Sequence, residues 1–351
     1  MNRALILMSR LSDYMLNCVT HWQRTTGIDI HVIHLKVDSA APFRFDPAEE
    51  GSVQFYQREE FDAESLGAWA QDLDPQLILC FGWMDPDYLS VVRRRKPSCS
   101  AVMTMDNQWL GTLRQGLGMV WSRLRLRSLF DHVWVPGPRQ HLFARKLGFA
   151  EPQIHEGLYV ANASNFDPIW QGLEGGAPIR RLVFTGRYAP EKGLNVLWDA
   201  FQRYHTDCES DLELWCIGAG ALESVKPEHP RIRHLGFVQP AELRECLVGG
   251  GVFVLPSTFE PWGLVVHEFA LAGFPLVLSS RVGAADRFLG DDNGFLLPEV
   301  TTDVLLRVIK HVDALSYREL AAMSYASRAR AEGLTVDDWA RQATAFLEGR
   351  A

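Results

Sequence analysis

Residues 259–273, FEPWGLVVHEFALAG, decide how this chain folds. They follow the apolar run GVFVLPS at residues 251–257, which has the length and composition of a buried strand. Pro261 suits the first turn of a helix, and Gly273 suits its left-handed C-terminal cap. A strand that leads directly into a helix leaves the first N–H groups of that helix free to bind an anion. The sequence therefore predicts a strand–turn–helix unit of a parallel α/β fold, with an anion site at the turn.

Two glutamates, Glu260 and Glu268, lie on either side of this helix start. Glu268 is one turn beyond Leu264, on the face along which a bound anionic ligand would run. A pyrophosphate repels a carboxylate, so we expect Glu268 to accept hydrogen bonds from sugar hydroxyls. Glu260, in the turn, is then free to face the group being transferred. The alternative interpretation is one first-turn glutamate and one solvated glutamate, both of which are common in helices.

A second stretch of the same kind, LVFTGRYAPEKG, occupies residues 182–193. It is an apolar strand that ends in a glycine turn carrying Arg187 and Lys192. Arginine offers a planar fork of donors and lysine a mobile point charge, and together they suit a diphosphate. The alternative is an exposed loop in which Glu191 neutralises one of the two cations.

Several motifs recur in a fixed order from residue 182 to residue 298: GRYAPEKG (186–193), IGAG (217–220), HLGFV (234–238), FEPWGLVVHEFALAGFPLVLSS (259–280) and DDNGFLLP (291–298). In this order and spacing, the chain resembles the retaining family-4 glycosyltransferases. The resemblance includes the paired glutamates with seven residues between them. It implies an α/β protein of the GT-B fold, in which two Rossmann-like, doubly wound parallel-sheet domains face a cleft.

The resemblance also implies roles for individual residues. Glu268 would hold the nucleotide ribose and Glu260 would lie close to the donor sugar. Glu260, Arg187 and Lys192 would form the catalytic set. Within donor binding, Arg187 and Lys192 would bind the diphosphate. The amides of Gly263 and Leu264 would approach the phosphates, and Phe237 and Val238 would frame the nucleobase. The full set assigned to donor binding is Gly186, Arg187, Lys192, Phe237, Val238, Gly263, Leu264 and Glu268.

The expected reaction moves a sugar from a nucleoside diphosphate to an acceptor hydroxyl with retention. The leaving diphosphate helps to deprotonate the acceptor, and the cations stabilise its negative charge. The DxD strings at residues 72–74 and 85–87 could suggest a metal-dependent GT-A glycosyltransferase, but each is more typical of a helix end beside a proline. We expect no cofactor and no metal, because the resemblance implies that arginine, lysine and helix amides bind the diphosphate. The alternatives are a nucleotide-sugar isomerase or phosphorylase with the same fold, and a non-catalytic sugar-nucleotide binding protein. An isomerase or phosphorylase should show an acid/base pair or a cofactor lysine, and a binding protein should lack charge in the motifs.

At 351 residues the chain is long enough for two domains, and 47% hydrophobic with 22% charged residues is ordinary for a globular protein. We expect an N-terminal acceptor-side domain over residues 1–165, a linker over 165–178, a donor domain over 179–334, and a C-terminal helix over 335–351 that returns to the first domain by family analogy. No apolar run reaches the ~18 residues of a membrane span. The apolar part of the first ten residues, MNRALILMSR, is too short for a signal peptide. We therefore expect a cytoplasmic chain whose six cysteines are buried free thiols.

Eleven strands are predicted: residues 4–8, 28–35, 53–56, 77–81, 101–105 and 133–135 in the first half, and 182–185, 212–217, 232–235, 252–255 and 276–278 in the second. The first strand is followed by MSRLSDYM, without the Gly-Gly loop that is frequent in the family. Asp106 and Asn107 follow the fifth strand, where α/β folds place function. We expect them on the acceptor side, and the alternative for Asp106 is a cap of the next helix.

Charge is unevenly distributed. The chain carries −8 overall, whereas residues 93–146 hold eleven basic and two acidic residues, a local balance of +9. The overall charge argues against nucleic acid as a partner. A helix predicted over residues 112–130 has a main apolar stripe, expected to face the core, and a second apolar set on nearly the opposite side. The stripe is Leu113, Leu117, Val120, Trp121 and Leu124, and the second set is Met119, Leu126 and Phe130. Such a helix is either sandwiched within the fold or offered to a membrane face or a lipid-linked acceptor.

Overall fold

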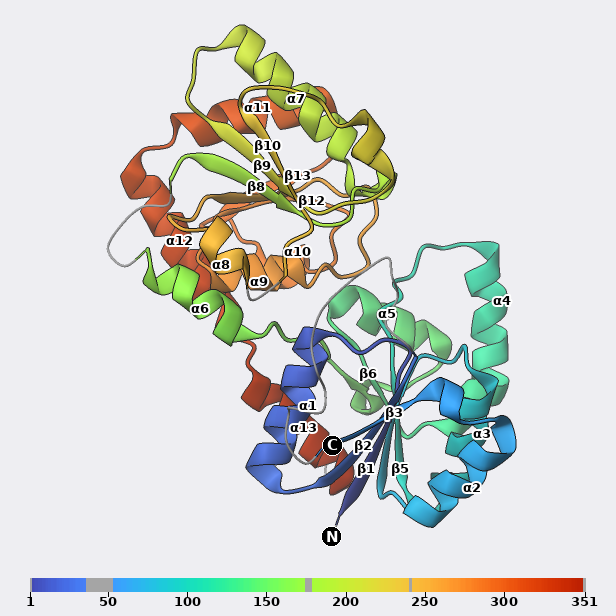
Figure 1. Cartoon of the computed structure of the whole chain (residues 1–351). Helices are drawn as coiled ribbons and strands as arrows, with labels where there is room; N and C mark the ends of the chain where they lie inside the picture. Colours follow the sequence, from blue (N-terminus) through green and yellow to red (C-terminus); the bar gives the residue numbers. More distant parts are fainter. Residues whose placement is uncertain (1, 36–52, 174–178, 240–241, 350–351) are drawn as a thin grey trace. The chain divides into compact units, whose positions relative to one another are not determined.

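Two parallel sheets organise the chain, each within a unit of its own (Figure 1). The structure is a computed structural model that describes residues 2–35, 53–173, 179–239 and 242–349. Unit 1 comprises Met1–Val160 and Leu334–Ala351, and unit 2 comprises Ala161–Gly333. Unit 1 ends five residues before the expected boundary at 165, and unit 2 begins 18 residues before the expected start at 179, so the segment expected as a linker belongs to unit 2. The expected boundary at 334 agrees to within one residue. No helix within the described ranges is long and apolar enough to cross a bilayer.

The sheet of unit 1 has the strand order β3-β2-β1-β4-β5-β6-β7, and every neighbouring pair is parallel. Its strands are β1 Arg3–Leu7, β2 Asp29–His34, β3 Gln54–Gln57, β4 Leu77–Phe81, β5 Ser100–Thr104, β6 His132–Trp134 and β7 Ile154–His155. Strands β1, β2, β4, β5 and β6 are largely buried and rich in apolar residues, which is why they were predictable. The edge strand β3 was also predicted, although its residues are only partly buried or exposed. The two-residue β7 is too short to give such a signal.

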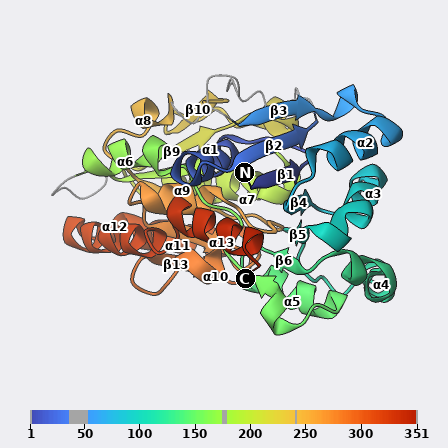
Figure 2. The ribbon, with the colours of Figure 1, turned by 90° about the horizontal axis from the view of Figure 1, so that it is seen from below.

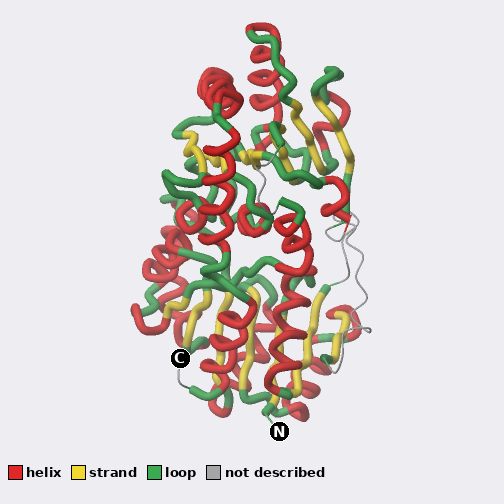
Figure 3. The backbone as a smooth tube through the Cα atoms, turned by 90° about the vertical axis from the view of Figure 1, so that its left-hand side faces the viewer, coloured by secondary structure: helices red, strands yellow, loops and turns green. Residues whose placement is uncertain are grey.

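Helices cover both faces of this sheet (Figure 3). They are α1 Asp13–Thr26, α2 Ala63–Leu73, α3 Pro86–Arg95, α4 Leu113–Trp121, α5 Pro138–Leu147 and α13 Val336–Leu347. Figures 1 and 2 show the C-terminal α13 beside α1. Trp22 of α1 donates from Nε1 to Thr344 Oγ1 at 2.9 Å and packs edge-on against Trp339. The end of the chain thus completes the core of unit 1.

The sheet of unit 2 has the order β10-β9-β8-β11-β12-β13 and is also parallel throughout. Its strands are β8 Arg181–Thr185, β9 Glu213–Ile217, β10 Ile232–Gly236, β11 Val252–Leu255, β12 Leu276–Ser279 and β13 Gly294–Leu297. Its helices are α6 Ala163–Gln171, α7 Leu194–Asp207, α8 Leu243–Cys246, α9 Val265–Leu271, α10 Ala285–Phe288, α11 Thr302–Ala314 and α12 Tyr317–Ala331. Helices α7 and α11 pack together on one face, and α9 and α12 on the other (Figure 1). The strand β13 was not predicted, because it is only partly buried.

The segment expected as a linker, residues 165–178, is mostly a helix. Residues up to Gln171 belong to α6, even though Pro168 lies inside that helix, and residues 174–178 fall outside the described part of the chain. The linker prediction is therefore wrong for the first half of the segment. Phe166 and Ile169 are buried, and α6 packs on α9 and α8. Tertiary packing compensates for the hydrogen bond that proline removes.

Both DxD strings lie at helix ends. Asp74 is the C-cap of α2 and forms an ion pair with Arg95. Asp85 is the N-cap of α3, accepting from the backbone N–H of Asp87, and Arg58 bonds the carboxylates of both. These aspartates therefore serve capping and ion pairing within unit 1.

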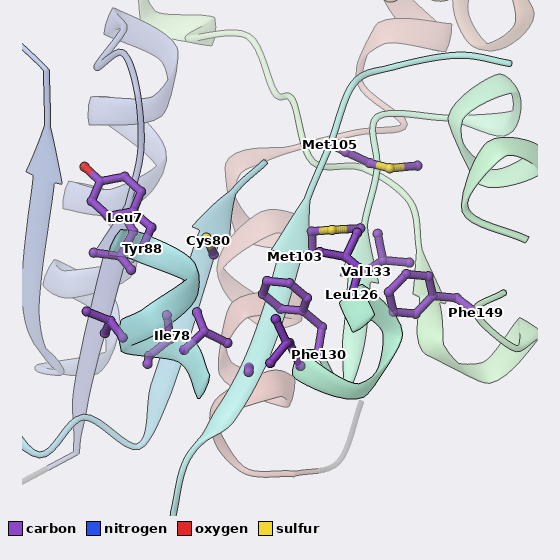
Figure 4. Close-up of a cluster of buried hydrophobic side chains, with 14 of the residues drawn as sticks. Leu7, Ile78, Cys80, Tyr88, Met103, Met105, Leu126, Phe130, Val133 and Phe149 are labelled. Atoms are coloured by element: carbon purple, nitrogen blue, oxygen red, sulfur yellow. The ribbon is translucent and has the colours of Figure 1, made fainter. Parts of the chain in front are cut away.

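The helix predicted over residues 112–130 is shorter and is turned the other way. After α4, the chain continues as a π-helical turn over Ser122–Leu126 and a 3-10 turn over Arg127–Leu129. Leu126 and Phe130, from the second apolar set, are buried near Met103 and Val133 (Figure 4).

The predicted core stripe of that helix is exposed instead: the exposed fraction is 91% for Leu113, 75% for Leu117 and 59% for Val120. The side chain of Leu124 lies outside the described part. The predicted orientation is therefore wrong. The periodicity separates the two faces of a helix but does not say which one meets the core.

Candidate active site

The loop after β8 places the first candidate cation. Lys192 ends a 3-10 turn, Pro190–Lys192, and Gly193 follows with a left-handed φ of +70°. A Cβ at Gly193 would lie 2.1 Å from the carbonyl oxygen of Pro256, just after β11. Only a glycine permits this approach, so the loops after β8 and β11 are packed directly on each other.

The loop after β11 places the first candidate carboxylate. Glu260 forms an isolated parallel bridge with Val282, which ties this loop to the one after β12. Gly263 has a φ of +89°, and a Cβ there would lie 2.9 Å from Cγ of Glu260. The helix begins at Val265, four residues after Pro261, so the expected helix start at the proline is corrected. The intervening turn holds Gly263 against the Glu260 side chain.

These two loops bring Lys192 and Glu260 into contact. The Lys192 ammonium donates to Oε2 of Glu260, and the side chains are only 14% and 13% exposed. Arg187 is different, because its side chain is 66% exposed and pairs with Glu191 at 3.2 Å. Both expected diphosphate-binding cations therefore lie against a carboxylate. The sequence interpretation in which Glu191 neutralises a cation applies to Arg187.

The position of this pair in the sheet follows from the topology. Strands β8 and β11 are neighbours at the point where the strand order of unit 2 reverses direction. In open parallel sheets, ligands bind outside the carboxyl ends of the strands at this reversal, because the two flanking loops diverge there. Lys192 follows β8 and Glu260 follows β11, one on each side of it.

The other predicted donor residues lie in unit 2 around the same edge of the sheet. Gly186 directly follows β8, and its N–H donates to the Ile217 carbonyl at the end of β9. Phe237 and Val238 follow β10, two strands away from β8, and Phe237 is partly exposed.

The last two predicted donor residues lie at α9. Leu264 is the N-cap of this helix, and Glu268 lies within it, half-buried. Glu268 is the candidate whose role rests most on the resemblance.

The two acceptor-side candidates belong to unit 1. Asp106 and Asn107 follow β5, and the helix after them is capped by Thr112, so Asp106 is not a helix cap. Tyr159 donates to Oδ2 of Asp106 at 3.4 Å. Burial raises the pKa of Asp106 despite this hydrogen bond. Asn107 is exposed and lines a pocket beside α4.

Sequence reasoning missed two hydroxyl residues at the strand reversal. Thr185 is the last residue of β8, and Ser257 follows β11 by two residues. Both side-chain oxygens are buried and have no hydrogen-bond partner among the described residues. A buried polar atom without a partner costs free energy and calls for an explanation, such as a ligand. Their signal in the sequence was a hydroxyl at the carboxyl ends of two strands, which becomes informative only once those strands are known to be neighbours.

His267 precedes Glu268 in α9. It is fully buried, stacks on Phe288, and accepts the Ala161 N–H at Nδ1 while Nε2 lies 3.0 Å from the Ala331 carbonyl. Burial lowers its pKa to about 4. A neutral imidazole thus joins the two ends of unit 2 and takes no part in the site.

Comparison with known proteins shows which family unit 2 resembles. Residues 179–312 match the family of glycosyl transferases group 1. A glycogen synthase from Alkalilimnicola ehrlichii is 29% identical over 236 residues, which is 61% of this chain and 45% of that protein. A glycogen synthase from Mycobacterium tuberculosis is 29% identical over 175 residues, 48% of this chain and 41% of that protein. The chain therefore spans less than half the length of these relatives.

Solved structures extend the likeness to the whole chain. Anabaena HepE in complex with UDP and glucose has a TM-score of 0.74 at 16% identity, covering 99% of this chain and 100% of that one. The α,α-trehalose-phosphate synthase (UDP-forming) from Burkholderia vietnamiensis has a TM-score of 0.72 at 13% identity, covering 99% and 100%. At these identities the likeness shows the fold, which is the GT-B fold of two Rossmann-like units.

The fold is therefore the GT-B fold, and residues 179–312 match a family of glycosyltransferases. Over residues 179–312, the chain is similar to the group 1 glycosyltransferases. The resemblance and the fold class predicted from the sequence are confirmed.

Proposed function

We propose that this chain is a retaining glycosyltransferase that moves a sugar from a nucleoside diphosphate to an acceptor hydroxyl, in glycan or glycolipid synthesis. The observation that carries the proposal is the largely buried contact of Lys192 with Glu260 at the strand reversal of unit 2. A cation and a carboxylate on either side of this reversal suit a ligand that carries both a diphosphate and a sugar. The family of residues 179–312 supports the same chemistry.

In the proposed reaction, the Lys192 ammonium turns from Glu260 toward the diphosphate and stabilises the charge that develops on the leaving group. Arg187, on its exposed loop, exchanges Glu191 for the same phosphates. Glu260 then faces the transferred sugar, and Glu268 holds the ribose. Phe237 and Val238 frame the base, and Gly186, Gly263 and Leu264 let the backbone approach the phosphates.

We further propose a uridine nucleotide as the first donor to test, because the HepE structures contain UDP or UDP-glucose. The acceptor is a saccharide or a lipid-linked hydroxyl compound on the side of Asp106 and Asn107. The reaction needs no metal and no cofactor, and the chain acts in the cytoplasm with peripheral membrane contact through the basic 93–146 region.

The proposal is tested by calorimetric titration of UDP into the wild type and Lys192→Met. Lys310→Met is the matched control, since Lys310 is another lysine of unit 2 with an ion-pair partner, Asp207, but lies on α11. We expect UDP to bind the wild type and the control alike, and the Lys192 variant about tenfold or more weakly. Equal binding by all three proteins would remove Lys192 from the donor site.

A transfer assay then separates the proposal from its alternatives. Release of UDP from a UDP-sugar that depends on an added acceptor supports transfer. Binding without turnover over a wide set of donors and acceptors would favour a non-catalytic sugar-nucleotide binding protein. Phosphate-dependent cleavage, or an altered nucleotide sugar without any acceptor, would favour a phosphorylase or an isomerase.

A further inference from the structure

An apolar stripe is exposed along the outer side of α4. Leu113, Leu117 and Val120 are three and four residues apart, so they share one face of the helix, and all three are largely exposed. Leu110 before the helix and Trp121 at its end extend the stripe. Figure 1 shows α4 at the margin of unit 1. A contiguous apolar surface of this kind on a folded unit marks an interaction site.

The charge around this stripe has one sign. Residues 107–130 contain Arg114, Arg123, Arg125 and Arg127 and no acidic residue. All four arginines are exposed, and none takes part in an ion pair within the described ranges. At 100° per residue, Arg114 and Arg123 fall on opposite sides of the stripe. The face is therefore apolar along its middle and cationic along both borders.

A pocket of about 430 Å³ opens beside the stripe, on the other side of Trp121. Its lining is mostly apolar and includes Met84, Trp121 and Phe143, with the border arginine Arg114 and the exposed acceptor candidate Asn107 at its wall. Met84 is itself 80% exposed, so apolar surface continues from the pocket toward solvent. This places an apolar recess, a polar amide and the exposed stripe next to one another in unit 1.

We propose that the outer face of α4 docks on the surface of an anionic phospholipid bilayer. Leucine and valine side chains would enter the acyl boundary, Trp121 would lie at the headgroup level, and the arginines would contact lipid phosphates. A second copy of the chain fits this face less well, because a two-fold contact would bring the arginine borders of both copies together.

Docking in this orientation specifies the acceptor, and this step rests on the proposed glycosyltransferase function. An acceptor carried by a membrane lipid would meet unit 1 at the stripe, with its apolar anchor in the pocket and its hydroxyl-bearing head toward Asn107. The chemical class of the acceptor is then a hydroxyl compound with an apolar, membrane-embedded tail.

Vesicle co-sedimentation of the full chain tests the docking. The probes are vesicles of phosphatidylcholine alone and of phosphatidylcholine mixed with phosphatidylglycerol, at low and high salt. We expect binding to the mixed vesicles at low salt, weaker binding at high salt, and little binding to phosphatidylcholine. Arg114→Gln with Arg125→Gln should reduce binding about fivefold for each arginine.

The contribution of the apolar stripe to docking is tested by the double variant Leu113→Ser with Leu117→Ser. This variant should bind vesicles more weakly, on the order of tenfold. The matched control is Val225→Ser with Val248→Ser, two valines of unit 2 that are 60% and 70% exposed and lie outside the stripe. The control should bind vesicles as the wild type does. Unfolding midpoints and UDP titration of each variant report folding and the donor site separately.

Several outcomes overturn the docking proposal. These are no binding to mixed vesicles at low salt, or binding that the leucine variant leaves unchanged. Concentration-dependent self-association that the leucine variant abolishes, without vesicle binding, would assign the stripe to a second copy. UDP binding tests the donor site of unit 2 on its own, so failure of the docking and failure of the proposed function are distinguishable.

Discussion

The ion pair of Lys192 and Glu260 is shielded from most of the surrounding water. Removing one partner of such a pair leaves an uncompensated buried charge, so Lys192→Ala should destabilise unit 2 by about 3 kcal/mol. It should also weaken UDP binding by about 1.5–3 kcal/mol, because a charged hydrogen bond to the diphosphate is lost. Urea unfolding and calorimetry measure the two effects.

The double variant Lys192→Met with Glu260→Gln separates these effects. Both charges are gone, so most of the stability should return, whereas UDP binding should stay weak. A single variant as stable as the wild type would contradict the buried pair. Recovery of UDP binding in the double variant would contradict a donor role for Lys192.

Gly263 lies against the Glu260 side chain, which makes it a probe of carboxylate placement. Gly263→Ala should cost about 1 kcal/mol for its left-handed backbone and displace Glu260, since the new Cβ would meet Cγ of Glu260 at 2.9 Å. Turnover should fall more than UDP affinity. Gly27→Ala is the control, because Gly27 has a φ of +69° with nothing within 4 Å of a Cβ. Equal turnover in the two variants would argue against this placement of Glu260.

Replacing the two glutamates of the motif should have different effects, because one is proposed to bind the nucleotide and the other to face the transferred sugar. Glu268→Gln should mainly weaken binding of bare UDP, because it removes a charged acceptor for the ribose hydroxyls. Glu260→Gln should leave UDP binding near that of the wild type and lower turnover. Calorimetry and a transfer assay measure the pair, and normal turnover in both variants would make the motif structural.

At the scale of elements, the strands were predictable and the faces of helices were not. Strands such as β4 and β11 are apolar throughout because they are covered on both faces, and that pattern is local. The orientation of α4 depends on which side meets α5, and residues 112–130 hold an apolar set on each side. The contact of Lys192 with Glu260 joins residues 68 apart. The sequence suggested a role for each but gave no sign that they are partners.

His267 gives the packing of α9 a pH dependence. Its pKa lies near 4 in the folded state, against about 6.5 in the unfolded chain, so protons bind preferentially to the unfolded state between these values. The stability that the neutral imidazole contributes is therefore complete above about pH 6.5 and is lost as the pH falls toward 4. From pH 7 to pH 5 the loss should be about 2 kcal/mol.

Urea unfolding of the wild type and His267→Gln at the two pH values measures this effect. The wild type should be the more stable at pH 7, and the difference should shrink by about that amount at pH 5. Phe288→Leu removes the stacked ring without removing a titrating group, so its difference from the wild type should stay constant. A constant difference for His267→Gln as well would contradict the shift.

On the scale of the whole molecule, donor binding should stabilise one unit and leave the other unchanged. The residues proposed to bind UDP all lie in unit 2, whose chain runs from Ala161 to Gly333. A ligand that binds only the folded state stabilises it by about 2.7 kcal/mol at one hundred times its dissociation constant. Hydrogen exchange should therefore show UDP-dependent protection in the strands and helices of unit 2, strongest in the loops after β8 and β11. The strands of unit 1 should exchange as they do without ligand.

The same measurement tests metal independence. In the proposed site, Arg187, Lys192 and backbone amides neutralise the diphosphate, so UDP should give equal protection in EDTA and in magnesium. Under the metal-dependent alternative, the phosphates would need the cation for charge compensation, and EDTA would remove most of the protection along with the transfer activity. If protection appeared only with added magnesium, we would conclude that a metal ion, rather than Arg187 and Lys192, compensates the charge of the diphosphate.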